Sequence, residues 1–367
     1  MAEVAHKPQL QSPQLQKPKL QRPKLQGIEA ARGVAATLVV IYHAARHLEA
    51  DGFGLPAFGG IETFGHAGVD FFFVLSGFII LFVHWGDLGR PNRLAHYAER
   101  RVTRIYPVYW AVLAVYVGIA IFGSQSASID APTLAANVVL YPLVPEPILG
   151  VAWTLEHEML FYMVFAVGIL HRGAGALAVV GWIGLMCAGM AGLVDRGTLG
   201  ITDVASSAFN VQFLMGMVAA VVARRARLPL PLVVALVGTA AFAAIGIAES
   251  RGMLDGNADP ARFLYGAAAF LVVIGLVERE RTSGLYIPRV MGVLGKASYS
   301  VYLGHLLVIG ASYKVLDAVG LVDALPVWLT HMLLVLFGLI GGVLLSILVE
   351  YPLMRFVRRF VKRPARA

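Results

Sequence analysis

The stretch "ARGVAATLVVIYH", residues 31–43, is apolar except for Arg32 and His43 near its two ends. At 100° per residue, the separation of eleven positions between Arg32 and His43 amounts to about 20° beyond three full helical turns. In a helix, Arg32 and His43 therefore lie on one face, about 16 Å apart along the axis. An apolar segment that carries two such side chains on one face is typical of a functional helix in a membrane, because polar groups there are costly to bury.

The composition of the whole chain agrees with this interpretation. Of its 367 residues, 58% are hydrophobic and 14% are charged, and the mean hydropathy is +0.73. A soluble domain usually carries about 25% charged residues. Too few polar residues are present to cover a globular surface in water, so we expect an integral membrane protein.

Apolar runs long enough to cross a bilayer recur along the chain. Because the backbone in lipid must satisfy its hydrogen bonds within each segment, these runs predict an all-α, polytopic helix bundle with about ten transmembrane helices. The predicted spans are 28–47, 67–85, 105–123, 153–171, 175–193, 204–223, 229–248, 261–277, 297–316 and 327–350.

Lysine and arginine residues are distributed unequally between the two sides of the predicted bundle. One side, which includes both termini, holds most of them, whereas the other side holds only Arg46, Arg196, Arg251, Arg262 and Lys314. Positive residues accumulate on the cytoplasmic side, so both termini are predicted to be cytoplasmic. The net charge of +8 is explained in this way and does not indicate nucleic-acid binding.

The two ends of the chain differ from the predicted transmembrane domain, 27–353. Residues 7–26, "KPQLQSPQLQKPKLQRPKLQ", repeat a five-residue unit that contains proline, which predicts a disordered, solvated tail over 1–26. Binding of its basic residues to lipid or to a partner is the alternative. Residues 354–367 form a basic cytoplasmic tail. No cleavable signal peptide is expected, and the single Cys187 excludes an intrachain disulfide.

Two carboxylates are predicted to lie at the depth of His43. Asp70, in "GHAGVDFFFVLSGFII", and Glu158, in "AWTLEHEMLFY", each follow the start of a span that enters from the outer side. A carboxylate beside an imidazole orients the ring and stabilises its protonated form, which prepares a general base. The alternatives are a structural histidine and a buried ion pair at Asp70. Glu156 and His157 are expected nearer the membrane surface.

A second polar layer is predicted at the cytoplasmic face. In "ERRVTRIYPVYW", Arg101 and Arg104 are three residues apart and share one helical face. Together with Arg32 they could hold an anionic ligand, since guanidinium groups suit phosphates. The alternative is that they only set the orientation of the protein in the membrane. Histidines and carboxylates do not cluster at metal-ligand spacing, so no metal site is predicted.

These motifs together resemble acyltransferase family 3, whose membrane proteins acylate extracytoplasmic glycans and some small molecules from acyl-CoA. The matching motifs are Arg-x10-His at 32–43, "GVDFFFVLSGF" at 68–78, "RRVTRIYPVYW" at 100–110, "WTLEHEMLFY" at 153–162, "LGKASYSVYLGHLL" at 294–307 and "VEYPL" at 349–353. Met159 stands where the family usually has a second glutamate. That departure is similar to the branch that acetylates exopolysaccharides.

The resemblance implies a donor and a path for it. Acetyl-CoA or another short acyl-CoA would bind through Arg32, Arg101 and Arg104, and no tightly bound cofactor is expected. His43, oriented by Asp70 or Glu158, would remove the proton of an acceptor hydroxyl or carry the acyl group itself. Tyr299, Tyr302, His305 and Glu350 are candidates to line the path, and Ser76 is expected to be a packing residue.

The implied acceptor is a glycan, free or lipid-linked, outside a bacterial inner membrane. Within the same chemistry, a macrolide-like small molecule is an alternative acceptor. Ten helices with ionisable groups at mid-membrane would also suit a transporter, and a non-catalytic scaffold for polysaccharide assembly is a third alternative. A scaffold would leave the buried His43, Asp70 and Glu158 without a purpose. The sequence assigns neither the acyl group, nor the acceptor, nor the oligomeric state.

Overall fold

The computed structural model describes residues 25–50, 52, 57–123, 129–143, 147–194 and 200–360. Over these residues the chain forms helices and connecting loops, with no strand. Nine of the described helical segments are long and apolar enough to cross a membrane, which confirms a polytopic helix bundle. Their main helices are α1 (Gln26–Ala50), α2 (Gly68–His84), α3 (Leu94–Phe122), α5 (Trp153–Leu170), α6 (Arg172–Met190), α9 (Pro231–Ser250), α10 (Asp259–Ser283), α11 (Arg289–Ala318) and α13 (Val327–Leu345).

The predicted span 204–223 differs from the other nine, because it is broken near its start. Helix α7 (Ile201–Ser206) ends at Ser207, whose backbone is extended, and α8 (Phe209–Arg225) begins two residues later. The Asn210 side chain donates to the carbonyl oxygens of Val204 and Ala205. A side chain that binds nearby carbonyls in this way competes with continued helix. Helix α8 keeps 17 residues, about 25 Å of length.

Short elements connect the long helices. Helix α4 (Ala131–Val139) lies in the predicted outer loop, and α14 (Tyr351–Phe360) continues the chain after α13 through a π-helical turn, η5 (Ser346–Glu350). The remaining short elements are η1 (Ile61–Ala67), η2 (Trp85–Asp87), η3 (Pro91–Arg93), η4 (Gly150–Ala152) and α12 (Leu321–Ala324). Most of the predicted N-terminal tail, 1–24, and the end of the basic tail, 361–367, lie outside the described residues.

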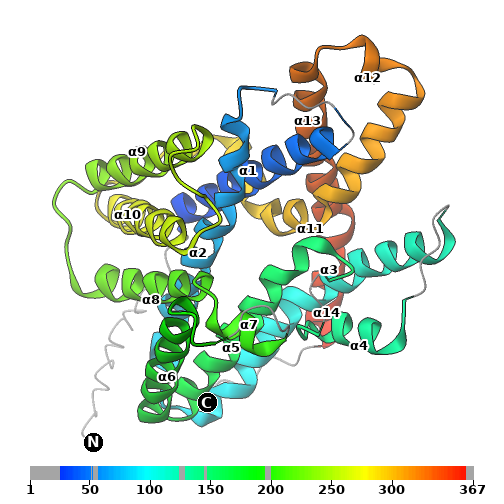
Figure 1. The fold of residues 1–367 in the computed structure, drawn as a ribbon. Coiled ribbons are helices and arrows are strands. Elements are labelled where there is room, and N and C mark those ends of the chain that lie inside the picture. Colours follow the sequence, from blue (N-terminus) through cyan, green and yellow to red (C-terminus); the bar gives the residue numbers. More distant parts are fainter. Residues whose placement is uncertain are drawn as a thin grey trace, which may run out of the picture.

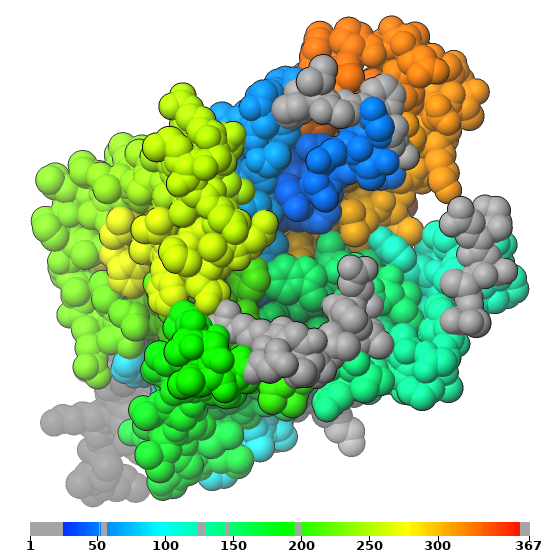
Figure 2. All heavy atoms as spheres, viewed as in Figure 1, coloured from blue at the N-terminus to red at the C-terminus, as the bar shows by residue number. Residues whose placement is uncertain are grey.

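Helices α1 and α2 occupy the centre of the molecule (Figure 1). On one side of them lie α9 and α10, which pack against each other, and α8 packs along α2. On the other side α11 packs against both α1 and α13. Figure 2 shows the same face with all atoms: the blue α1 and η1 lie between the yellow-green α9 and α10 and the orange α11. The helix that carries Arg32 and His43 is therefore enclosed by its neighbours.

Glycines allow two of these helix pairs to approach closely. A Cβ atom on Gly77 of α2 would lie 2.0 Å from a backbone oxygen of α8, and one on Gly216 of α8 would lie 2.0 Å from a backbone oxygen of α2. Between α1 and α11, a Cβ on Gly33 would lie 2.8 Å from the nitrogen of Gly295, and one on Gly295 would lie 2.1 Å from a backbone oxygen of α1. Small residues at helix crossings in membranes permit this packing, which fixes α1 against α11.

Candidate functional site

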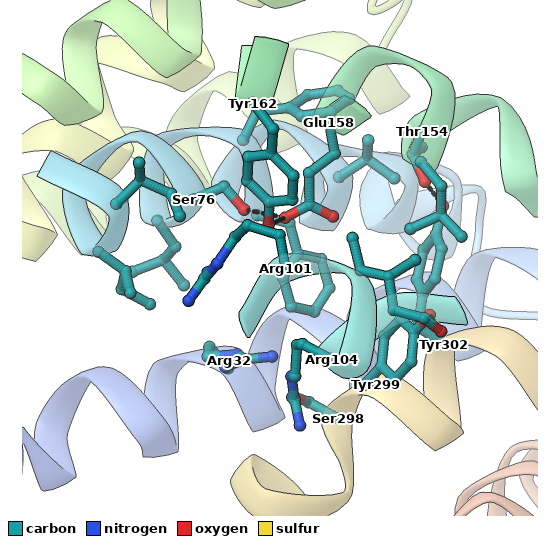
Figure 3. Close-up of a pocket in the computed structure, with 18 residues that line it drawn as sticks. Arg32, Ser76, Arg101, Arg104, Thr154, Glu158, Tyr162, Ser298, Tyr299 and Tyr302 are labelled. Carbon is teal, nitrogen blue, oxygen red and sulfur yellow. Dashed lines mark hydrogen bonds between the residues drawn. The ribbon is translucent and has the colours of Figure 1, made fainter. Parts of the chain in front are cut away.

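A pocket of about 130 Å³ lies among α1, α2, α3, α5 and α11. Arg32, Arg101 and Arg104 line it together with Glu158 and a set of hydroxyl groups (Figure 3). Its remaining polar lining residues are Ser76, Thr154, Tyr162, Ser298, Tyr299 and Tyr302. The three predicted arginines, from two helices, are thus brought to one cavity.

Each arginine of α3 lies over an aromatic ring of a neighbouring helix. The guanidinium carbon of Arg101 is 5.6 Å from the ring centre of Tyr162, and that of Arg104 is 5.4 Å from the ring centre of Tyr299. Arg104 also donates from Nη1 to Oε1 of Glu350 at 3.0 Å. Cation–π contacts of this kind hold a guanidinium in place without using its hydrogen-bond donors, so donors remain for a ligand.

Two polar atoms of this pocket are buried without a hydrogen-bond partner among the described residues. They are Nε of Arg101 and Oγ of Ser298. Buried donors are nearly always paired in folded proteins, and an orphaned one calls for an explanation such as a missing ligand. Beside three guanidinium groups, that ligand would be an anion with several acceptor oxygens.

Glu158 faces the arginines and is not hydrogen-bonded to His43. Its Oε1 accepts from Ser76 Oγ at 2.9 Å and from the hydroxyl of Tyr162 at 2.5 Å. Ser76, which was expected to be a packing residue, is therefore a hydrogen-bond donor in the pocket. Glu158 lines the same pocket as Arg32. The prediction that Glu158 orients His43 is therefore corrected, since Ser76 and Tyr162 satisfy its carboxylate.

A larger cavity of about 1150 Å³ adjoins the pocket, and Arg32 and Arg104 line both. We call this cavity the vestibule. Its other basic lining residues are Arg90, Arg224, Lys296, Arg355 and Arg358, and its acidic ones are Glu29, Asp87 and Glu350. All the basic residues belong to the side of the molecule that the charge distribution predicts to be cytoplasmic. The size and charge of the vestibule suit a large anionic molecule. Arg32 and Arg104 lie where the vestibule meets the pocket.

Glu350, a predicted path-lining residue, lines the vestibule and fixes Arg104. Besides accepting from Arg104, its carboxylate accepts from Ser300 Oγ at 2.6 Å and from Ser346 Oγ at 3.0 Å. Glu350 is the last residue of the π-helical turn, which connects α13 to α14. Such turns are often found at functional sites.

His43 lies against His305, beyond the pocket. The Nδ1 atom of His43 is 3.1 Å from Nε2 of His305 and 2.9 Å from the carbonyl oxygen of Val39. Tyr302 lines the pocket, and its ring centre is 6.0 Å from that of His305. The hydroxyl of Tyr302 is bonded to Thr154 Oγ1 at 2.9 Å. Tyr302 thus lies next to both the arginine pocket and the pair of histidines.

Asp70 is fully buried, but its partner is an arginine, not His43. Arg262 donates from Nη1 to Oδ2 of Asp70 at 2.8 Å, and the Gln212 amide donates to Oδ1. The link to His43 is indirect, because the ring of Tyr42 lies between those of His43 and His66, and Arg262 also bonds to His66. The prediction that Asp70 orients His43 is corrected here, since a nearer guanidinium satisfies its carboxylate.

The sequence did not predict the polar network around Arg262. His66 bonds through Nε2 to Oε1 of Glu249 at 2.7 Å, and Tyr265 donates to Oε2 of Glu249 at 2.6 Å. Arg262 is 7% exposed. Its occurrence in an apolar span on the outer side, where basic residues are scarce, was the signal that could have identified it. Glu156 and His157, expected nearer the membrane surface, are buried as well.

Comparison with known proteins agrees with the resemblance found in the sequence. The family model for the acyltransferase domain of acyltransferase family 3 matches residues 25–351. The chain is 32% identical over 303 residues to the exopolysaccharide production protein ExoZ of Rhizobium meliloti (strain 1021). The aligned residues cover 80% of this chain and 90% of that protein. No solved structure matches this chain.

Proposed function

This chain belongs to acyltransferase family 3 and is a multi-pass membrane acyltransferase, and we propose that it O-acylates an exopolysaccharide. The group moved is an acetyl or other short acyl group, the donor is cytosolic acyl-CoA, and the acceptor is a hydroxyl of a free or lipid-linked glycan. The reaction takes place at a bacterial inner membrane. The similarity to an exopolysaccharide production protein supports the choice of acceptor.

The observation that carries the proposed donor is the meeting of the pocket and the vestibule at Arg32 and Arg104. Coenzyme A combines a polyanionic nucleotide end with a long, thin, weakly polar arm that ends in the thioester. The vestibule is large and basic enough for the nucleotide end, whose phosphates reach the guanidinium groups of the smaller pocket, and the arm continues from there toward His43. Arg32, Arg101 and Arg104 bind the phosphates, because guanidinium groups pair with phosphate oxygens through charge-assisted hydrogen bonds.

The reaction itself is assigned to His43. In the proposed step, His43 takes the proton of the acceptor hydroxyl while the hydroxyl oxygen attacks the thioester carbonyl carbon. The carbon–sulfur bond then breaks, the thiolate of CoA leaves, and the proton on His43 passes to that thiolate. The axial distance from Arg32 to His43, about 16 Å, is within the reach of an extended pantetheine arm. The arm would pass beside Tyr302, which lines the pocket and whose ring centre is 6.0 Å from that of His305.

The first experiment measures the product in cells. We expect mass spectrometry of the surface polysaccharide to show an acyl substituent in cells with the intact gene and its loss in cells without it. The mass of the substituent identifies the acyl group, and fragmentation identifies the sugar that carries it. An unchanged polysaccharide would contradict the proposed acceptor.

The second experiment tests His43 with the purified protein in lipid nanodiscs. Removal of a general base typically costs about 10²–10⁴-fold in rate, so His43→Ala should lose detectable release of CoA thiol in the presence of acceptor. The same variant should still insert into membranes and still bind acetyl-CoA, because the proposed phosphate site lies at the other end of the path. Full activity of His43→Ala would exclude His43 as the base.

A further inference from the structure

The contact between His43 and His305 also indicates which ring nitrogens carry hydrogen. The two rings come from α1 and α11, their centres are 4.8 Å apart, and the planes are inclined by 55°. His305 is fully buried. With Nε2 of His305 at 3.1 Å from Nδ1 of His43, one of these nitrogens must carry the hydrogen and the other must accept it.

Two backbone carbonyl groups decide which nitrogen carries the hydrogen. Nδ1 of His305 is 3.1 Å from the oxygen of Val301, four residues earlier on α11. A carbonyl oxygen only accepts, so Nδ1 of His305 bears the hydrogen, and in a neutral imidazole Nε2 is then the acceptor. On α1, Nδ1 of His43 is 2.9 Å from the oxygen of Val39. The hydrogen of His43 is therefore on Nδ1 as well, and it is shared between Val39 and His305.

From this arrangement we infer that His305 is a positioning residue, which holds His43 in the form protonated at Nδ1 and leaves Nε2 as the basic atom. The inference rests on the proposed function, in which His43 is the base. When Nε2 of His43 takes the proton of the acceptor hydroxyl, the resulting cation still donates from Nδ1 to Nε2 of His305. In this role His305 accepts the hydrogen bond through Nε2 and stays neutral, and the charge remains on His43. The second histidine thus has the orienting role that a carboxylate has beside other catalytic histidines.

No carboxylate among the described residues is bonded to His43, so this role falls to His305. The sequence suggested Asp70 and Glu158 for it, but these are bonded to Arg262 and to Ser76 and Tyr162. A neutral acceptor suits a site within a membrane, because a second buried charge would add to the cost of desolvation. The Nε2 acceptor of His305 still fixes the orientation of the His43 ring and the position of its hydrogen.

A pair of variants at one position tests the inference. His305→Gln can place its amide oxygen near the position of the ring Nε2 and keep an acceptor for His43, whereas His305→Leu fills similar space without one. We expect kcat of His305→Leu to fall by about 10- to 100-fold, less than for His43→Ala, because Val39 still accepts from Nδ1. His305→Gln should keep kcat within about threefold of the unchanged protein. KM for acetyl-CoA should not change in either variant, since the proposed donor arginines are distant.

The outcomes separate this inference from the proposed function. If His43→Ala is inactive and His305→Leu is fully active, His305 has no positioning role, although His43 can still be the base. Equal losses in His305→Leu and His305→Gln would mean that His305 only fills space, which also overturns the inference. Full activity of His43→Ala would instead overturn the proposed base itself.

A spectroscopic measurement checks the hydrogen position without relying on activity. In protein labelled with ¹⁵N in its histidine rings, the signals of His43 are those that disappear in His43→Ala. We expect them to show a hydrogen on Nδ1 in the unchanged protein and an added share of the form with the hydrogen on Nε2 in His305→Leu, where Val39 is the remaining acceptor. A hydrogen on Nε2 of His43 in the unchanged protein would overturn the inference.

Discussion

Arg104 has two roles: it pairs with Glu350, and it is proposed to bind the phosphates of acyl-CoA. Two variants can separate these roles. Arg104 donates to Glu350, which is 6% exposed and also accepts from two serine hydroxyls. Arg104→Ala leaves this buried carboxylate without its cation. We expect a loss of about 1–3 kcal/mol in stability together with a raised KM for acetyl-CoA. Thermal unfolding in detergent and steady-state kinetics measure the two effects.

The double variant Arg104→Ala, Glu350→Gln is the matched control, because it removes the unpaired charge while Arg104 stays absent. Stability should recover in this variant, but donor affinity should not. If both recover, Arg104 acts only by neutralising Glu350. Arg32 forms no ion pair with the other described residues. Arg32→Ala should therefore raise KM for acetyl-CoA without the loss of stability expected for Arg104→Ala.

Asp70 and Arg262 form an ion pair in which both side chains are buried. Removing one member of such a pair is strongly destabilising, by about 3–5 kcal/mol, because the other charge is left buried and unpaired. We therefore expect Asp70→Ala to unfold at a clearly lower temperature. The double variant Asp70→Asn, Arg262→Gln should regain much of this stability, since no isolated charge remains. An Asp70→Ala protein that is inactive but as stable as the unchanged one would instead favour a direct role in the reaction.

At the scale of the helices, the crossing of α1 and α11 decides whether the two histidines meet. A Cβ on Gly295 would lie 2.1 Å from the carbonyl oxygen of Glu29, so Gly295→Ala forces the two helices apart. Because Arg32 and His43 are on α1 and His305 is on α11, the histidine contact should be disturbed. We expect Gly295→Ala to lower kcat by at least tenfold, comparable with His305→Leu, and to lower the unfolding temperature.

Gly292 supplies the control on the same helix, three residues away. A Cβ at that position meets no other atom within 4 Å. Alanine also favours helix over glycine by up to about 1 kcal/mol. Gly292→Ala should therefore keep full activity and be at least as stable as the unchanged protein. If both alanine variants behave alike, the close approach of α1 and α11 is not what positions the histidines.

At the scale of the whole molecule, α8 decides the topology. Nine membrane crossings would place the termini on opposite sides, whereas ten place them on the same side. Helix α8 packs along α2 and is about 25 Å long, close to the roughly 30 Å thickness of a bilayer core. We propose that α8 is the tenth crossing and that both termini are cytoplasmic, as the basic residues predict.

Reporter fusions test this topology. Green fluorescent protein joined to the C-terminus should fluoresce, and alkaline phosphatase at the same place should be inactive, because each reports the side on which it folds. A fusion at Gly252, in the loop between α9 and α10, should show the opposite pattern. An active phosphatase at the C-terminus would mean that α8 does not cross the membrane.

The amino-acid sequence by itself determined the class of fold, most of the helices and the family. Long apolar runs leave a chain in lipid no alternative to helices, because the backbone must be satisfied within each segment. Arg32, Arg101 and Arg104 could be grouped because each lies at a predicted cytoplasmic end of a helix, and depth in the membrane is readable from position in a span. The break at Ser207 was missed, since hydropathy does not register one polar residue that ends a helix.

Only the tertiary structure decided which polar groups touch at a given depth. Depth places His43, Asp70 and Glu158 in one layer, but the rotation and neighbours of each helix set their partners. Asp70 is hydrogen-bonded to Arg262, Glu158 to Ser76 and Tyr162, and His43 to His305. The hydrophobic pattern of a span fixes how far each residue lies from the membrane surface. The direction in which a side chain points depends on contacts between helices that are far apart in the sequence, such as the meeting of α1 and α11 through Gly33 and Gly295.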